Sequence, residues 1–103
     1  MTYRIVLTTA ARADLREISN YHRRIAGDPI AHALSEKIIA AAASLSERPT
    51  RQRLRNDLSP RLRALSVGNY MIFYRVQQDA VAVVRILHGS RNITPQFFHP
   101  IDD

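Results

Sequence analysis

Three arginines stand inside stretches that are otherwise apolar, and they are the first residues of this chain that could do chemistry. Arg63, Arg75 and Arg85 each lie among residues typical of β-strands. A guanidinium without water or an anion carries a large desolvation cost, so each of these side chains needs a partner. For Arg75 and Arg85 we expect Asp57, Asp79 or solvent at a sheet edge to supply it. A structural role and an anion-binding role are both open.

The segment from residue 48 to residue 63 is the most basic part of the chain. It holds Arg48, Arg51, Arg53, Arg55, Arg61 and Arg63, and Asp57 is its single acid. The whole chain has a net charge of +6 and a pI of about 10.8. A positive surplus also serves solubility, but clustered guanidiniums pair with phosphates or carboxylates. We therefore expect an anionic macromolecule as partner.

The composition argues against several other classes of function. The chain has no cysteine, which excludes disulfides, thiolate metal ligands and cysteine nucleophiles. Its four histidines lack metal-ligand spacing, so we expect no metal and no cofactor. No apolar run reaches the roughly 20 residues of a membrane span, and the N-terminus lacks a signal-peptide core. We expect a soluble, cytoplasmic protein without a membrane partner.

The first half of the chain predicts one strand and two helices. Alternating apolar residues at 3–7 indicate a strand, and Thr8 or Thr9 caps the helix that follows. That helix has an apolar stripe (Ala11, Leu15, Ile18, His22 and Ile25) and a mostly wet side (Arg12, Asp14, Arg16, Glu17 and Arg23). Gly27 ends it, and Asp28 as N-cap with Pro29 in the first turn begins a second helix. This helix buries Ala31, Leu34, Ile38, Ala41 or Ala42, and Leu45, and it ends at Pro49.

The second half predicts three strands between residues 60 and 93. Residues 50–59 form a loop that carries the basic cluster, and turns at 68–69 and 77–79 join the strands as hairpins. Strands at 70–76 and 81–88 are apolar on both faces, which is typical of the middle of a sheet. The order predicts an α+β two-layer β-α-α-β-β-β fold, with a helical hairpin on one face of a mainly antiparallel four-stranded sheet. We expect one domain, 1–103, with an ordered core of about 3–95 and a tail at 94–103.

Several residues that look functional have a simpler interpretation as packing. We expect His22 to be a half-buried residue with a backbone partner, and Tyr70, Phe73 and Tyr74 to belong to the core. In the tail, Phe97, Phe98 and Ile101 are expected to fold back onto the sheet.

The chain resembles the ParE branch of the RelE/ParE toxin superfamily over roughly residues 3–95. The resemblance lies in Ala-x-x-Asp-Leu-x-x-Ile at 11–18, Tyr-His at 21–22, Leu-Arg at 62–63, Gly-Asn-Tyr-Met-Ile-Phe-Tyr-Arg-Val at 68–76, and Val-Arg-Ile-Leu-His-Gly-Ser-Arg-Asn-Ile at 84–93. It implies a bacterial toxin of a type II toxin–antitoxin pair, with growth inhibition and plasmid stabilisation as its effects. It also implies DNA gyrase as target and a ParD-like or Phd-like antitoxin.

The antitoxin can also be argued from charge. We expect a groove between the helical hairpin and the sheet, where an acidic amphipathic segment sets carboxylates against arginines. The antitoxin- or target-binding candidates are Arg53, Arg55, Arg61, Arg63, Arg75, Arg85, His88 and Arg91.

A RelE-like, ribosome-dependent mRNA endoribonuclease is the alternative function. In that reaction a 2′-hydroxyl attacks the adjacent phosphate, and a base, an acid and cations for the developing charge would all help. The candidates are Arg63, Arg75, Arg85, His88 and Arg91, and Arg91 lies where the resemblance places a phosphate-stabilising arginine. The same region of the ribonucleases carries a tyrosine or histidine, whereas this chain has Phe97 and Phe98, followed by His99. His88 or His99 could in principle act as the proton-transfer group. We therefore expect an inhibitory binding protein, and an endoribonuclease if it is an enzyme.

A plain nucleic-acid-binding module is a third hypothesis. It would show sequence-independent DNA binding with a steep salt dependence. The basic residues lie on a loop and on strands, and the sequence shows no recognition helix to read a groove.

Overall fold

The computed structural model of the protein describes residues 2–98, and it confirms the expected β-α-α-β-β-β order. The elements are β1 (Arg4–Leu7), α1 (Thr9–Ala26), α2 (Asp28–Ala43), β2 (Arg63–Val67), β3 (Tyr70–Gln77) and β4 (Ala80–His88), with short 3-10 helices η1 (Ser44–Ser46), η2 (Pro49–Arg51) and η3 (Pro95–Phe98). His99 and Ile101 lie outside the described residues.

Thr8 begins the helical hairpin and also fixes it to the sheet. Its hydroxyl accepts a hydrogen bond from the Ala11 N–H at 3.1 Å and donates one to the Val84 carbonyl at 3.0 Å. Gly27, with φ of 92°, separates the two helices as predicted. The prediction that Asp28 caps α2 was wrong, because Gly27 occupies the cap position. Asp28 lies in the first turn instead, and its carboxylate pairs with Arg23 at 3.0 Å.

Three other details of the helices differ from the sequence prediction. The α-helical part of α2 ends at Ala43 and continues as η1, so it stops before Pro49. Ile25 was placed on the buried stripe, yet it lies near the open end of the hairpin and is 61% exposed. Asp14 was assigned to the wet side, yet it is buried.

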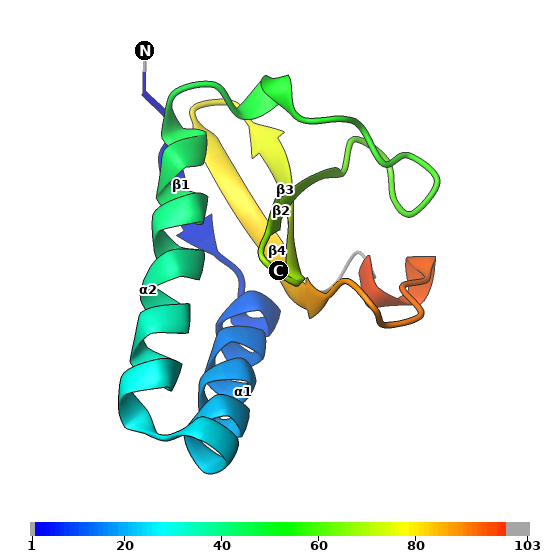
Figure 1. Cartoon of the computed structure of the whole chain (residues 1–103). Helices are drawn as coiled ribbons and strands as arrows, with labels where there is room; N and C mark the ends of the chain where they lie inside the picture. Colours follow the sequence, from blue (N-terminus) through cyan, green and yellow to red (C-terminus); the bar gives the residue numbers. More distant parts are fainter. Residues whose placement is uncertain (1, 99–103) are drawn as a thin grey trace.

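The sheet has the strand order β1-β4-β3-β2, so β3 and β4 are central as their apolar sequences predicted. β1 runs parallel to β4, and the other two pairs are antiparallel. Both predicted hairpin turns are present, with φ of 58° at Gly68 and 54° at Gln78. A register shift between Phe73 and Tyr74 marks a bulge opposite them on β4. Figure 1 shows the helical hairpin, in blue to green, against this sheet.

The two faces of the sheet belong to two separate apolar clusters. On the helix side, Ile72 and Tyr74 of β3 pack with Ile38 of α2, and all three are almost fully buried. On the other side, Phe73 is buried under Leu62 and Phe98. The second face is therefore covered at its centre by the 58–62 segment and η3. The predicted return of Phe97 and Phe98 onto the sheet is confirmed.

Candidate functional site

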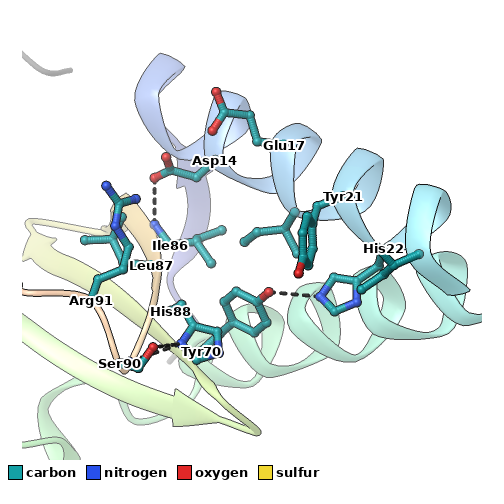
Figure 2. Close-up of a pocket in the computed structure, with 12 residues that line it drawn as sticks. Asp14, Glu17, Tyr21, His22, Tyr70, Ile86, Leu87, His88, Ser90 and Arg91 are labelled. Carbon is teal, nitrogen blue, oxygen red and sulfur yellow. Dashed lines mark hydrogen bonds between the residues drawn. The ribbon is translucent and has the colours of Figure 1, made fainter.

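A groove of about 650 Å³ lies between α1 and the end of β4, and we call it the α1–β4 groove. It is lined by Asp14, Glu17, Ile18, Tyr21, His22, Ile25, Tyr70, Ile86, Leu87, His88, Ser90 and Arg91. Figure 2 shows one wall formed by α1 and the facing wall formed by β4, Tyr70 of β3 and the turn after β4. Two predicted site residues, His88 and Arg91, meet here.

Helical spacing produces the α1 wall. The positions 14, 17/18, 21/22 and 25 recur at steps of three and four, and they therefore share one face of the helix. The outer part of this wall is open to solvent, because Tyr21 is 50% exposed and Ile25 is 61% exposed. An aromatic and an aliphatic side chain thus stand uncovered beside polar groups.

Asp14 and Arg85 form a buried ion pair beneath the groove. Arg85 Nε and Nη2 donate to the two Asp14 carboxylate oxygens at 2.7 and 2.8 Å, and the side chains are only 19% and 9% exposed. The Ile86 N–H also donates to Asp14 Oδ2 at 2.9 Å. The predicted partners of Arg85, Asp57 and Asp79, were wrong. Arg85 has its donors turned inward, where they join α1 to β4.

The Nδ1 nitrogen of His88 already accepts a hydrogen bond from Ser90. The Ser90 backbone N–H lies 3.1 Å from His88 Nδ1, and the Ser90 hydroxyl lies 2.7 Å from the same atom. A backbone N–H can only donate, so Nδ1 accepts and the neutral ring carries its proton on Nε2. In this tautomer the ring presents a donor, and its basic nitrogen is covered by Ser90. Such a ring is poorly suited to take a proton from a substrate.

Tyr70 links His88 to His22 across the groove. Its ring meets the His88 ring edge to face at a centroid distance of 5.1 Å, and its hydroxyl lies 3.0 Å from His22 Nε2. Burial, with a smaller effect of neighbouring Tyr21, raises the pKa of Tyr70 above its ordinary value. His22 is half-buried as predicted, but its partner is this hydroxyl and the expected backbone partner is absent from its hydrogen bonds among residues 2–98. Tyr70 belongs to the core as predicted.

Arg91 projects from the turn after β4 and rests on an aromatic ring. Its guanidinium carbon lies 4.9 Å from the centroid of the Phe97 ring, and that of Arg85 lies 5.3 Å from the same centroid. Within residues 2–98 the Arg91 guanidinium makes no hydrogen bond or ion pair. It is therefore an available cation, and its aromatic neighbour can neither donate nor accept a proton.

Arg63 and Arg75, predicted as site residues, use their donors to hold the chain together. Arg63 Nη1 donates to the carbonyls of Thr50 at 3.1 Å and Gln52 at 2.5 Å. Arg75 Nε donates to the Pro60 carbonyl at 3.2 Å, and its Nη2 donates to the Ser59 hydroxyl. The predicted pairing of Arg75 with Asp57 or Asp79 was wrong. Three of these four hydrogen bonds go to backbone carbonyls, whose positions the sequence does not reveal.

The other predicted arginines lie away from the α1–β4 groove. Arg53 and Arg55 line a separate hollow beside β2 and β3, and Arg61 lines a third near Ser59. Arg55 is bonded to Asp57 at 3.0 and 3.1 Å, and hydrogen bonding between them lowers the pKa of Asp57. We expected one arginine-lined groove, but these arginines and Arg91 are distributed over three separate hollows.

The structure adds groove residues that sequence reasoning did not single out, namely Glu17, Tyr21 and Ser90. For Glu17 and Tyr21 the signal lies in the helical spacing of 14, 17/18, 21/22 and 25, whereas Ser90 lies in the turn after β4 and has no such signal. Figure 2 shows Glu17 on the α1 wall and His88 on the facing β4 wall, and among the described residues the hydrogen bonds of His88 go to Ser90 and not to Glu17. Within residues 2–98, no three His, Asp or Glu side chains gather as a metal site.

Comparison with solved structures identifies the fold. The chain superposes with a TM-score of 0.76 and 20% identity on a chain of the chromosomal ParDE toxin–antitoxin system of P. aeruginosa, covering 84% of this chain and 96% of that one. For the toxin–antitoxin complex RelBE2 of Mycobacterium tuberculosis the TM-score is 0.65 at 24% identity, covering 85% and 92%. For a free mutant of the E. coli toxin RelE it is 0.59 at 16%, covering 95% and 92%. These likenesses show a RelE/ParE fold.

Comparison of sequences identifies the family, whereas comparison of structures identifies only the fold. Residues 5–93 match the family model described as the ParE toxin of the type II toxin–antitoxin system parDE. Toxin ParE3 of Caulobacter vibrioides is 31% identical over 93 residues, which is 90% of this chain and 93% of that protein. The chain belongs to the ParE family of type II toxins, and an antitoxin is therefore its partner. No helix within residues 2–98 is long and apolar enough to cross a membrane.

Proposed function

We propose that this toxin inhibits DNA gyrase by binding to it, and that a ParD-like antitoxin neutralises it. The proposal places its action in the bacterial cytoplasm, where gyrase works, with growth inhibition as the outcome. Stabilisation of a plasmid that encoded the pair would follow. The gyrase target comes from the family resemblance, and the structure contributes an argument against the enzymatic alternative.

The observation that carries the proposal is the state of the groups beside Arg91. Cleavage of RNA through its 2′-hydroxyl needs a base that is free to accept a proton. His88 Nδ1 already accepts from Ser90, and Asp14 is bonded to Arg85 and Ile86. The ring under Arg91 is Phe97. Within residues 2–98, His88 Nδ1 and Asp14 are therefore already engaged, which suits recognition of an anionic group by Arg91 better than phosphodiester cleavage.

The antitoxin, in this proposal, places one segment in the α1–β4 groove. Tyr21 and Ile25 offer exposed apolar surface, and Arg91 offers a guanidinium that makes no ion pair within residues 2–98. An amphipathic segment could bury apolar side chains on the first two and set a carboxylate on the third. The net charge of +6 favours an acidic partner and speeds its capture.

Parallel assays on the purified toxin test the target. We expect the toxin to inhibit supercoiling of a relaxed plasmid by gyrase and to leave transcripts intact in a reconstituted translation system. Addition of the antitoxin should restore supercoiling. Cleavage of messenger RNA in the presence of ribosomes, with supercoiling unaffected, would show instead that the chain is a RelE-like endoribonuclease. His88→Ala and Arg91→Ala would then abolish the cleavage.

A further inference from the structure

The arginine-rich segment is a fixed platform, although its sequence reads as an irregular loop. We call residues 48–61 the arginine loop. Its start is tied to the sheet because the Tyr74 hydroxyl donates to the Pro49 carbonyl at 2.6 Å and Arg63 donates to Thr50 and Gln52. Tyr74 is fully buried. The backbone of the loop is thus held from below by side chains of β2 and β3.

The second half of the arginine loop is held just as firmly. Arg55 N–H donates to the Leu62 carbonyl at 2.6 Å, next to an isolated bridge between Leu54 and Arg63. Arg75 reaches up from β3 to the Pro60 carbonyl, and Leu58 is buried in the apolar cluster on the second sheet face. Figure 1 shows the loop, in green, extending away from the helical hairpin.

The arginines of this region fall into two groups. Arg55, Arg63 and Arg75 have internal partners, as described above. Arg48, Arg51, Arg53 and Arg61, which we call the presented arginines, are exposed and their guanidiniums make no hydrogen bond or ion pair within residues 2–98. The loop's own acid, Asp57, is already bonded to Arg55. Within residues 2–98, four guanidiniums without an ion-pair partner therefore project from a backbone whose conformation is already fixed in the free toxin.

The surroundings of the presented arginines fit phosphates better than a protein partner. Protein interfaces need a desolvated apolar centre, and the one large exposed apolar side chain of the arginine loop is Leu54, at 44%. Single-stranded nucleic acids are held by stacking on aromatic rings, and residues 48–63 contain none. Duplex backbones require only positioned cations, which this loop provides.

We propose that the arginine loop binds duplex DNA through its phosphates, with Arg48, Arg51, Arg53 and Arg61 making the contacts. This binding is sequence-independent and does not need gyrase, so it goes beyond the proposed inhibition. In a cell it would keep the toxin close to the DNA on which gyrase acts.

The salt dependence of DNA binding by the purified toxin tests this inference. The probe is a fluorescent 20-base-pair duplex of arbitrary sequence, titrated from about 50 to 200 mM salt. Four phosphate contacts predict a slope of about −3.6 for log K against log salt, or a loss of about 150-fold over this range. The double variant Arg51→Gln with Arg53→Gln should give a slope of about −1.8 and a loss of about 12-fold.

A charge-matched variant separates the loop from overall charge. Arg16→Gln with Arg24→Gln removes the same two charges from exposed positions on α1, and it should keep the slope near that of the unaltered toxin. Both pairs are exposed, so thermal unfolding should be unchanged in both. Single-stranded DNA of equal length should bind more weakly than the duplex.

Three results would overturn the inference. One is a slope that falls equally in the loop and α1 variants, which would indicate only net charge. Another is tighter binding of single-stranded DNA or of duplex RNA than of duplex DNA. The third is unchanged DNA binding by the loop variant together with weaker antitoxin binding, which would make the loop a protein-binding surface. No gyrase is present, so none of these results depends on the supercoiling assay.

Discussion

Asp14 on α1 and Arg85 on β4 form a two-point ion pair in which the carboxylate also accepts the Ile86 N–H. The ion pair therefore connects α1 of the helical hairpin to the central strand β4. Thr8 binds the Val84 carbonyl from the same helix end, so the bulged part of β4 is held by α1 from two sides. Arg85 in turn packs against Phe97, over which Arg91 lies. The pair therefore supports the β4 wall of the α1–β4 groove.

Replacing Asp14 with Asn should destabilise the fold by about 3 to 5 kcal/mol, because it removes the negative charge of a largely buried ion pair. Chemical denaturation with urea measures this as a lower midpoint. The matched control is Asp79→Asn, which breaks the exposed pair with Arg4, where the side chains are 65% and 69% exposed. We expect a loss of at most about 1 kcal/mol there. Equal losses in the two variants would contradict the structural role of Asp14.

The sequence predicted the element order, both hairpins and the central position of β3 and β4, because these depend on local periodicity and turn residues. It did not predict Asp14, since a carboxylate on a helix is normally solvated and its partner is distant in sequence. The same limit applied to Arg63 and Arg75. Their guanidiniums bind backbone carbonyls of a loop without periodicity, and carbonyl positions cannot be inferred from residue types. The sequence therefore indicated which arginines need partners, but it did not predict the groups inside the protein that they bind.

Tyr74 should make stability depend on alkaline pH. Burial raises the pKa of Tyr74 from 10.0 to about 12 in the folded protein. The unfolded chain ionises first, so this stabilisation is complete below about pH 10 and is lost as the pH rises toward 12. We expect the urea midpoint to fall over this window, and to fall less in Tyr74→Phe. That variant should also lose about 1 kcal/mol at neutral pH with the hydrogen bond to the Pro49 carbonyl.

The exposed Tyr21 supplies the control for this pH experiment. Tyr21→Phe removes a phenol that is half in solvent and should keep most of the alkaline fall, because Tyr21 makes only the smaller contribution to the raised pKa of Tyr70. Part of the fall should survive in Tyr74→Phe, because burial also raises the pKa of Tyr70. A Tyr74→Phe profile that overlays the original would show that Tyr74 ionises equally well in both states.

His88 should carry its proton on Nε2 when neutral, because the Ser90 N–H and hydroxyl both face Nδ1. Nitrogen-15 NMR of the imidazole at neutral pH distinguishes the two ring tautomers directly. Ser90→Ala keeps the backbone N–H and should preserve the tautomer, whereas His22, whose ring pairs with Tyr70, serves as an internal comparison. A proton found on Nδ1 would free a basic nitrogen in the groove. The argument against nuclease chemistry would then fail.

Antitoxin binding should depend on Tyr21 and Arg91 in two different ways. Tyr21→Ala removes exposed apolar area from the α1 wall and should weaken binding by at least tenfold, equivalent to about 1.4 kcal/mol, at every salt concentration. Arg91→Ala should weaken binding at low salt and much less at high salt, because ions screen the charges over about 8 to 10 Å at physiological strength. Arg16→Ala, which lies outside the groove lining, is the control for net charge. Calorimetric titrations at two salt concentrations give all these constants. If the Tyr21 and Arg91 variants bind the antitoxin as tightly as the unaltered toxin does, the antitoxin occupies another face of the molecule.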